Sequence, residues 1–426
     1  MKNIYILGGG TFSDVRCHLS ISARAFGDTA ITLEKIFNKQ LTEMGLNDKY
    51  QTKLVLTRMA QPHNNPYNII TNEDAGNFLD KIIEDPATEA IIQNFALCDF
   101  DGKIDSVTSG KNAERLRTSA GNVSMDLKPA PKMIKKIREV RKDIFAVGFK
   151  TTSNQESTTQ YLRGLDLLKS NSLNLVLAND VGNYRNMIIA PEETRYCETV
   201  GRDRTEVLEF LVKMTLSRMQ NNFTRSTVVE GDLIDWNGEM IPENLRTVVN
   251  HCIKEGAYKP FNGKTAGHFA VRLSESEYAT SIRKTNYNNL NSTGLVKIVS
   301  KNKDEVIAYG AKPSVGGQSQ RSIFADNPDK NFIVHFHCPM KEGSEDIIPV
   351  AEQWPNECGS HECGNNTSSH LREIDLGDGH ILGAVFLKNH GPNLVYGKDV
   401  PAYKINNFID KNFDLSAKTG GLVHAH

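Results

Sequence analysis

The sequence lacks the features that would place it in a membrane, secreted or nucleic-acid-binding class. No stretch approaches the roughly 18 consecutive apolar residues of a transmembrane helix. The seven cysteines are odd in number and widely spread, so they predict free thiols and not a disulfide framework. The net charge of −1 gives the whole chain no field that would draw it to nucleic acid or to a membrane surface. These absences predict a cytoplasmic protein that acts on small molecules.

The length and composition predict two packed domains. The chain has 426 residues, of which 39% are hydrophobic, enough for two cores. The polar stretch Gln220–Ser226 separates two halves that differ in their pattern of predicted helices and strands. We therefore place the domain boundary between residues 221 and 222. The predicted domains are therefore residues 1–221 and 222–426, with no internal repeat and no low-complexity segment.

The first half alternates short apolar runs with amphipathic stretches, a rhythm that predicts a Rossmann-like, doubly wound parallel sheet. The first run, Ile4–Leu7, ends in three glycines and reads as a strand, not as a signal peptide. The predicted strands are Asn3–Leu7, Lys53–Thr57, Ala90–Phe95, Ile144–Phe149 and Leu173–Ala178. The predicted helices are Thr32–Met44, Glu73–Glu84, Pro131–Val140, Thr158–Lys169 and Arg204–Met219.

The second half predicts a different α/β domain, with a mainly antiparallel sheet. Its predicted helices are Pro242–Glu255 and Pro401–Phe413. Its predicted strands are His268–Leu273, Leu295–Val299, Val306–Tyr309, Phe332–His335 and Leu382–Leu387.

Two features of the first half are candidates for ligand binding. Gly8–Gly10 follow a strand directly, where backbone N–H groups can approach a phosphate, although a tight strand-to-helix turn is the simpler explanation. Asn179 and Asp180 end another predicted strand, where open α/β sheets bind ligands, and the alternative there is an Asn-Asp turn. The amide of Asn179 could hold an oxyanion. The GxGxxG dinucleotide fingerprint is absent, which disfavours an NAD(P) oxidoreductase.

Five segments of the first half follow one another in an informative order. They are Gly9–Thr11, Ala96–Phe100, Leu127–Lys132, Gly148–Thr151 and Ala178–Asp180. Together, over about residues 1–218, they resemble phosphopantothenoylcysteine synthetase, the ligase of coenzyme A synthesis. That family activates a carboxylate with CTP, or with ATP in some members, and an amine then displaces the nucleotide.

The resemblance implies roles for individual residues. Asn179 would bind the acyl intermediate, and Asn186 would sit near the base or ribose of the nucleotide. The remaining residues of the implied nucleotide site are Gly9, Gly10, Asp99 and Phe149. The nucleotide would be CTP or ATP with Mg²⁺.

Two departures from the family concern the substrate. Ser22–Asp28 stands where the family has a Ser-Ser-Gly-Lys-Met-Gly-like loop. Arg204 aligns with a lysine that contacts the triphosphate, and we count it as a catalytic residue. Arginine keeps the charge of that lysine but not its geometry. We therefore expect activity with phosphopantothenate and cysteine to be weak, or to be replaced by activity on another carboxylate–amine pair.

Three histidines of the second half form a candidate metal site. His335 and His337 are two residues apart in the strand-like run Phe332–Cys338, and alternate side chains of a strand share one face. His390 follows another predicted strand. Three neutral imidazoles with one open position make up a catalytic zinc site, although ligand type alone also allows manganese or iron. A lone His-x-His is often incidental, so His390 decides the interpretation.

These histidines, with Gly267–Arg272 and Lys312–Ser314, resemble class II (fuculose-phosphate type) aldolases and their epimerase and dehydratase relatives over about residues 240–415. In that family a divalent metal polarises the carbonyl of the donor ketone. Gly316 stands where the family has its acid/base glutamate, and glycine cannot transfer a proton. His268 replaces an asparagine of the substrate loop. Ordinary aldol cleavage is therefore not expected.

A Cys- and His-containing loop leaves alternatives open. Cys358, His361 and Cys363, with Cys338, could form a second, structural zinc site, or the thiols could simply be buried. His361 or Glu362 could also replace the missing acid. The departures leave a non-catalytic scaffold of two degenerate enzyme folds as the alternative to an enzyme. Both resembled families form oligomers, which implies a homo-oligomer.

Overall fold

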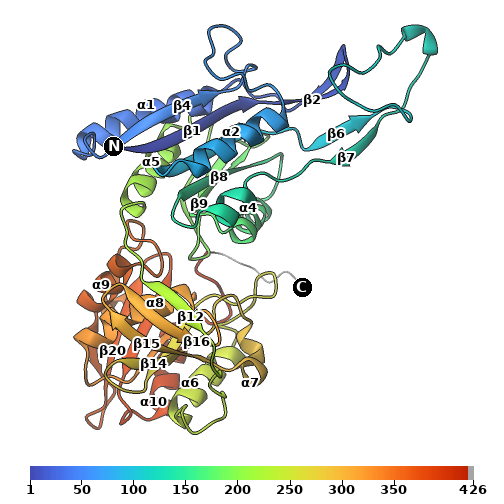
Figure 1. Cartoon of the computed structure of the whole chain (residues 1–426). Helices are drawn as coiled ribbons and strands as arrows, with labels where there is room; N and C mark the ends of the chain where they lie inside the picture. The colour runs from blue at the N-terminus through green and yellow to red at the C-terminus, as the bar shows by residue number, and fades with distance from the viewer. Residues whose placement is uncertain (421–426) are drawn as a thin grey trace. The chain divides into compact units, whose positions relative to one another are not determined.

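The computed structural model describes residues 1–420, and of residues 120 and 315–319 it describes the backbone alone. The chain divides into two compact units (Figure 1). The first comprises Met1–Ile189 and Cys197–Met219, and the second comprises Ala190–Tyr196 and Gln220–His426. Within residues 1–420, no helix is both long enough and apolar enough to cross a membrane.

The first unit is built on a seven-stranded sheet in the order β11-β10-β9-β8-β5-β1-β4, although Ala190–Tyr196, at the end of β10 and the start of β11, are grouped with the second unit. Strands β4, β1, β5, β8 and β9 run parallel, and β10 runs antiparallel to β9. The strands are β1 Lys2–Gly10, β4 Tyr50–Leu56, β5 Thr88–Ala96, β8 Phe145–Thr152, β9 Leu175–Asp180, β10 Arg185–Ala190 and β11 Thr194–Val200. The predicted Rossmann-like sheet is confirmed.

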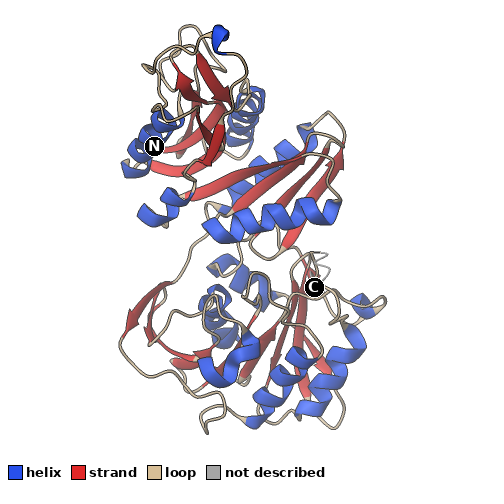
Figure 2. Cartoon of the chain, turned by 90° about the vertical axis from the view of Figure 1, so that its right-hand side faces the viewer, coloured by secondary structure: helices blue, strands red, loops and turns tan. Residues whose placement is uncertain are grey.

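Helices cover both faces of this sheet, as its continuous apolar strands require (Figure 2). They are α1 Asp28–Glu43, α2 Asn72–Glu84, α3 Lys135–Val140, α4 Ser157–Asn171 and α5 Thr205–Arg218. The prediction of a helix from Pro131 is wrong, because α3 begins only at Lys135. The chain is still held at Ala130, whose N–H donates to the carbonyl of Asp99.

Two β-ribbons of the first unit were not predicted. They are β2 Phe12–Arg16 with β3 Leu19–Ser22, and β6 Phe100–Lys103 with β7 Asp126–Pro129. The explanation of the glycine triplet as a strand-to-helix turn is wrong, because β1 runs through Gly10 into β2. A Cβ on Gly10 would lie 1.9 Å from the carbonyl oxygen of Ala23. One on Gly9, where φ is +103°, would lie 2.2 Å from Thr57 Oγ1. Close chain approach therefore requires these glycines.

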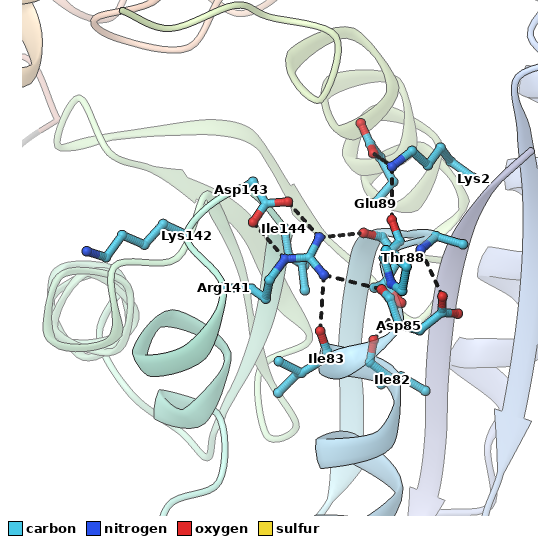
Figure 3. A network of polar contacts seen from close by, with 12 residues as sticks. Lys2, Ile82, Ile83, Asp85, Thr88, Glu89, Arg141, Lys142, Asp143 and Ile144 are labelled. Atoms are coloured by element: carbon cyan, nitrogen blue, oxygen red, sulfur yellow. Dashed lines mark hydrogen bonds and ion pairs between the residues drawn. The ribbon is translucent and has the colours of Figure 1, made fainter. Parts of the chain in front are cut away.

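Arg141 ties two turns of the first unit together (Figure 3). Its Nη1 donates to the carbonyls of Ile83 and Asp85, at 3.2 Å each, and its Nη2 donates to that of Thr88 at 3.4 Å. Its Nε and Nη2 also donate to the carboxylate of Asp143 at 2.8 and 2.6 Å. The hydrogen bonds between the two side chains raise the pKa of Arg141 and lower that of Asp143. This cluster joins the α2–β5 turn to the α3–β8 turn.

The second unit contains a ten-stranded sheet in the order β12-β16-β15-β14-β13-β17-β21-β20-β18, with β19 also paired to β20. Most pairs are antiparallel, as predicted, whereas β12–β16 and β18–β20 are parallel. The strands are β12 Arg225–Val229, β13 His268–Arg272, β14 Glu277–Thr280, β15 Val296–Asn302, β16 Glu305–Tyr309, β17 Phe332–His335, β18 Val350–Ala351, β19 Arg372–Asp375, β20 Ile381–Leu387 and β21 Gly391–Tyr396.

The helices of this unit are α6 Glu243–Lys254, α7 Leu290–Thr293, α8 Val315–Asp326, α9 His361–Ser369 and α10 Ala402–Asn412. Helices α6 and α10 pack together, and α8 packs against α9 and β13. Trp236, Phe269 and Phe336 lie in the main hydrophobic core. Several elements had no counterpart among the predicted ones, namely the strands β12, β14, β18, β19 and β21 and the helices α7, α8 and α9.

Candidate functional sites

Three buried histidines lie together at one edge of the sheet in the second unit. One ring nitrogen from each of His335, His337 and His390 lies within 4.8 Å of the others. The ring centroids are 4.5 Å apart for His335 and His390, 4.7 Å for His337 and His390, and 5.0 Å for His335 and His337. The structure thus brings these three sequence-predicted residues together.

The backbone brings the three rings together, but His335 and His337 do not both lie in the strand that the sequence predicted to carry them. Strand β17 ends at His335, so His337 lies beyond the strand that was predicted to carry both rings. His390 lies in the turn between β20 and β21, and β21 pairs with β17, with Asn393 opposite His335. A Cβ on Gly391 would lie 2.0 Å from the carbonyl oxygen of Phe336. Only glycine therefore lets this turn approach the end of β17.

The protonation of His335 suits a metal ligand. Its Nδ1 lies 2.7 Å from the carbonyl oxygen of Pro392, which can only accept, so Nδ1 carries the proton and Nε2 keeps its lone pair. Burial lowers the pKa of His335 to about 4, although the bond to Pro392 opposes the shift. The ring is therefore neutral at pH 7.

The spacing of two nitrogens also fits a metal ion. His335 Nε2 lies 3.1 Å from His390 Nε2. Two nitrogens bound tetrahedrally to one zinc ion, with bonds of about 2.0–2.1 Å, would lie about 3.3 Å apart. The donor set and this distance therefore fit a divalent ion held by the three histidines.

Thr419 connects the backbones of two of these histidines. Its N–H donates to the carbonyl of His337 at 3.0 Å, and its Oγ1 donates to the carbonyl of His390 at 3.0 Å. The residue therefore fixes the spacing between two segments that carry ring ligands. We refer to it below as the Thr419 clasp.

A small cavity adjoins His335 and His390, and His268, Cys358 and Cys363 are among the residues that line it. The ring of His268 lies 4.8 Å from that of His335, centroid to centroid. Burial, together with the neighbouring His335, holds the pKa of His268 well below its usual value, so it too is neutral.

Helix α8 reaches the histidines through Gln320, whose Nε2 hydrogen-bonds to Nδ1 of His268. Sequence reasoning missed Gln320, and no pattern distinguishes it from other polar residues. Gly316, at the expected acid/base position, lies in the first turn of this helix, where the structure describes the backbone alone.

Four residues considered for a second zinc site are not gathered into one. They are Cys338, Cys358, His361 and Cys363. Within residues 1–420, the three histidines form the one grouping of potential metal ligands. His361 Nε2 lies 3.2 Å from Thr224 Oγ1, and the carboxylate of Glu362 accepts from the N–H and the amide of Asn222 at 2.9 Å each. These contacts favour structural roles for His361 and Glu362 over acid/base catalysis.

In the first unit, three predicted residues lie on neighbouring strands near their ends. Asn179 of β9 pairs with Asn186 of β10, and Thr151 of β8 donates from Oγ1 to Asn179 Oδ1 at 3.3 Å. Phe149 lies two residues before Thr151 on β8. The side chain of Asn186 is buried and donates from Nδ2 to the carbonyl of Tyr184 at 3.0 Å.

Asp180, next to Asn179, has a structural role. Burial alone would raise the pKa of its carboxyl, but hydrogen bonds lower it strongly. The donors are the backbone N–H groups of Asn154, Gln155, Gly182 and Asn183 and the hydroxyl of Thr152. The carboxylate organises the two loops that follow β8 and β9, so it is not a candidate acid or base.

Arg204 lies at the start of α5 and reaches the first turn of α1. Its Nη1 donates to Thr29 Oγ1 at 3.1 Å. Its Nε and Nη2 are buried and have no acceptor among the described residues. Burial lowers the pKa of Arg204, yet a guanidinium stays charged at pH 7. A cation with unused N–H groups at a helix N-terminus is suited to an anion.

Two other residues of the predicted nucleotide site lie in positions that suit nucleotide binding less well. Gly10 already donates its N–H to the carbonyl of Ala25 at 2.8 Å. Asp99 is exposed and pairs with Lys132 at 2.5 Å.

Sequence reasoning missed Asn72 at the carboxyl ends of β1 and β5. Its Oδ1 accepts from Thr11 Oγ1 at 2.6 Å and from the N–H of Cys98 at 3.0 Å, and its Nδ2 donates to the carbonyl of Cys98 at 2.7 Å. Its place at the start of α2, directly after the Thr71 cap, was the available signal.

Comparison with known proteins shows a distant sequence similarity over part of the chain. No known family model matches the chain. Over 192 residues the chain is 24% identical to the coenzyme A biosynthesis bifunctional protein CoaBC of Methanocaldococcus jannaschii, which covers 43% of this chain and 41% of that protein. The chain is thus distantly related to a coenzyme A biosynthesis protein. It spans about two fifths of the length of this relative.

Solved structures of two kinds resemble the fold. The DNA/pantothenate metabolism flavoprotein from Streptococcus pneumoniae has 19% identity and a TM-score of 0.41, covering 51% of this chain and 99% of that chain. L-fuculose-1-phosphate aldolase from Thermus thermophilus has 14% identity and a TM-score of 0.27, covering 39% and 87%. YgbL from Escherichia coli, a putative aldolase/epimerase/decarboxylase, has 14% identity and a TM-score of 0.29, covering 39% and 85%. These likenesses carry no statement about activity.

Proposed function

We propose that the chain is a bifunctional enzyme, with a nucleotide-dependent carboxylate–amine ligase in the first unit and a divalent-metal enzyme in the second. The observation that carries the ligase half is the guanidinium of Arg204, with buried, unused N–H groups at the first turn of α1. The distant similarity to a coenzyme A biosynthesis protein supports the same reaction class.

In this proposal a carboxylate becomes an electrophile when CTP or ATP, with Mg²⁺, supplies its leaving group. Arg204 and the α1 N-terminus bind the triphosphate, and the amide of Asn179 stabilises the acyl intermediate. Asn186 lies by the base or ribose, and Gly9, Gly10, Asp99 and Phe149 line the site. The substrates differ from phosphopantothenate and cysteine, because Arg204 and Ser22–Asp28 depart from the family pattern.

Calorimetry with CTP and with ATP, each with Mg²⁺, tests the ligase half. We expect binding of one of them, and pyrophosphate release once a suitable carboxylate is present. Lys35→Gln, on the exposed face of the same helix α1, is the control and should bind the nucleotide normally. Absence of binding for both nucleotides would refute this half of the proposal.

In the second unit, His335, His337 and His390 would hold one divalent ion, for which we propose zinc. When bound, the ion would act as a Lewis acid towards a substrate oxygen. The neutral rings of His335 and His268 and the hydrogen bond from Gln320 shape the site around it. Ordinary aldol cleavage is not expected, because Gly316 carries no group that transfers a proton.

Elemental analysis tests this half. We expect about one divalent ion per chain, lost in the double variant His335→Ala, His337→Ala and kept in His370→Ala, which removes an exposed histidine. Metal that persists in the double variant would exclude the assignment. We expect little turnover of fuculose-type sugar phosphates.

The second candidate function is a non-catalytic scaffold, which the replacements Gly316 and His268 favour. It predicts neither nucleotide-dependent pyrophosphate release nor a bound metal, so the same two experiments separate it from the enzyme. We also propose a homo-oligomer, since both resembled families form oligomers, and light scattering on the purified chain measures its mass.

A further inference from the structure

Near the histidine cluster lies an arginine that has no counter-charge among the residues the structure describes. Arg283 is half-buried in the loop that follows β14. Among the side chains that the structure describes, its guanidinium has no hydrogen-bond, ion-pair or aromatic partner. Burial lowers the pKa of Arg283 and no carboxylate offsets this effect, but a guanidinium remains charged.

Other arginines of the same unit donate hydrogen bonds to backbone carbonyls. Arg272 donates to the carbonyls of Lys330 and Asn327 at 3.0 Å each. Arg246 donates to the carbonyl of Gly238 at 3.1 Å. A cation withdrawn from water without such acceptors is costly. An anionic ligand would provide the hydrogen-bond acceptors and the counter-charge that no described side chain gives to Arg283.

The backbone of Arg283 is fixed. Its N–H donates to the carbonyl of Lys312 at 2.9 Å, and Ile282 forms a bridge with Pro313. The N–H of Ser314 donates to the carbonyl of Ser281 at 3.0 Å. On the other side of Arg283, the carbonyl of Thr285 accepts from the N–H of Thr265 at 3.0 Å. The arginine therefore lies in a segment that is held before and after it.

Strand register places Arg283 at the same sheet edge as the histidines. Strands β14, β13 and β17 are consecutive neighbours in the sheet. Thr280, the last residue of β14, pairs with Ala270, and His268 pairs with His335. Arg283 follows Thr280 by three residues, so it lies two strands from His335. At about 4.8 Å per strand, their backbones are roughly 10 Å apart.

We propose that Arg283 binds the anionic group of the second unit's substrate, a phosphoryl or carboxylate group, while the substrate's other end reaches the cluster of His335, His337 and His390. This inference rests on the proposed metal function of that cluster. A guanidinium offers two parallel N–H groups to such an oxyanion. The spacing selects a short bifunctional compound, with metal-binding oxygens at one end and the oxyanion at the other.

Calorimetry on the zinc-loaded full chain tests this assignment, with phosphoglycolate and malonate as probes. Both probes carry a carboxylate for the metal, and they differ in the second anionic group, so their relative affinity distinguishes a phosphoryl from a carboxylate ligand. Arg283→Gln should weaken the tighter probe by about 10- to 100-fold without changing zinc content. Arg225→Gln, which removes an exposed arginine of the same unit, should leave the affinity unchanged.

Unchanged affinity in Arg283→Gln, or an equal loss in Arg225→Gln, would overturn the proposal. If Arg283→Gln does not fold, Arg283→Lys replaces it, and a loss of about 3- to 10-fold is expected because lysine lacks the planar fork. If the wild type takes up no zinc, the proposed metal function fails by itself. Inorganic phosphate binding to the metal-free chain then tests Arg283, and either no binding or binding unaffected by Arg283→Gln counts against it.

Discussion

Arg204 donates from Nη1 to Oγ1 of Thr29 at 3.1 Å, and this bond joins the start of α5 to the first turn of α1. The contact leaves two buried donor groups of the guanidinium for a ligand.

Arg204→Gln should weaken nucleotide triphosphate binding by about tenfold or more, because a charge-assisted hydrogen bond is worth roughly 1.5–3 kcal/mol. Arg204→Lys should retain more affinity than Arg204→Gln, since it keeps the charge. Calorimetry measures both, with circular dichroism to show that the variants fold. Equal affinities for the wild type and Arg204→Gln would contradict this role.

Asn179→Ala should separate binding from turnover. The amide is assigned to the acyl intermediate and not to the bound nucleotide, so we expect nucleotide affinity to change little. Turnover in a pyrophosphate-release assay should fall by about 10²–10³, the usual effect of losing one oxyanion donor. A parallel loss of nucleotide affinity would instead place Asn179 in the nucleotide site.

Asp180→Asn should destabilise the first unit by about 2 kcal/mol at pH 7, because the charged acceptor of five hydrogen bonds is lost. The folded pKa of Asp180 is depressed, so its stabilisation is present above the unfolded value of about 3.9 and disappears as pH falls through the folded pKa. Urea titrations should therefore show the variant approaching the wild type only below about pH 4. A gap independent of pH would contradict this explanation.

Arg141→Gln should lower the free energy of unfolding by about 1–3 kcal/mol, since it leaves the carbonyls of Ile83, Asp85 and Thr88 without this donor. Chemical denaturation measures the loss. Lys142→Gln, next in the chain and exposed, should be neutral.

Thr419→Val should weaken metal binding by about tenfold, because residues that orient metal ligands typically contribute 10- to 100-fold to affinity. The variant keeps the backbone bond to His337 and loses the hydroxyl bond to His390. Competition with a chromophoric chelator measures the affinity, and Thr419→Ser should restore it. A Thr419→Val protein with wild-type affinity would show that the clasp is dispensable.

The sequence predicted those parts of the fold in which the pattern is local. The apolar run at Ile4–Leu7 predicted β1, and His335 and His337 predicted ligands on one side of the chain. The ribbons β2–β3 and β6–β7 were missed because their short segments have no period that marks them as strands. The start of α3 was misplaced because the pairing of β7 with β6 is a long-range effect.

Of the candidate site, the sequence predicted only the grouping of the three histidines. Gln320 reaches His268 across 52 residues, and Thr419 binds backbone carbonyls, which leave no trace in side-chain identity. Arg283 is an ordinary loop arginine in the sequence. That it has no partner among the described side chains becomes visible only in the fold, where Lys312 and Pro313 lie beside its segment.

The Thr419 clasp also sets an order of events during synthesis. Thr419 leaves the ribosome 29 residues after His390, so all three histidines are made before the group that fixes two of their backbones. A nascent chain carries the ring ligands while their spacing is still unfixed. If the histidines bind a metal ion as proposed, a nascent chain arrested before residue 419 should bind it more weakly than the full chain does.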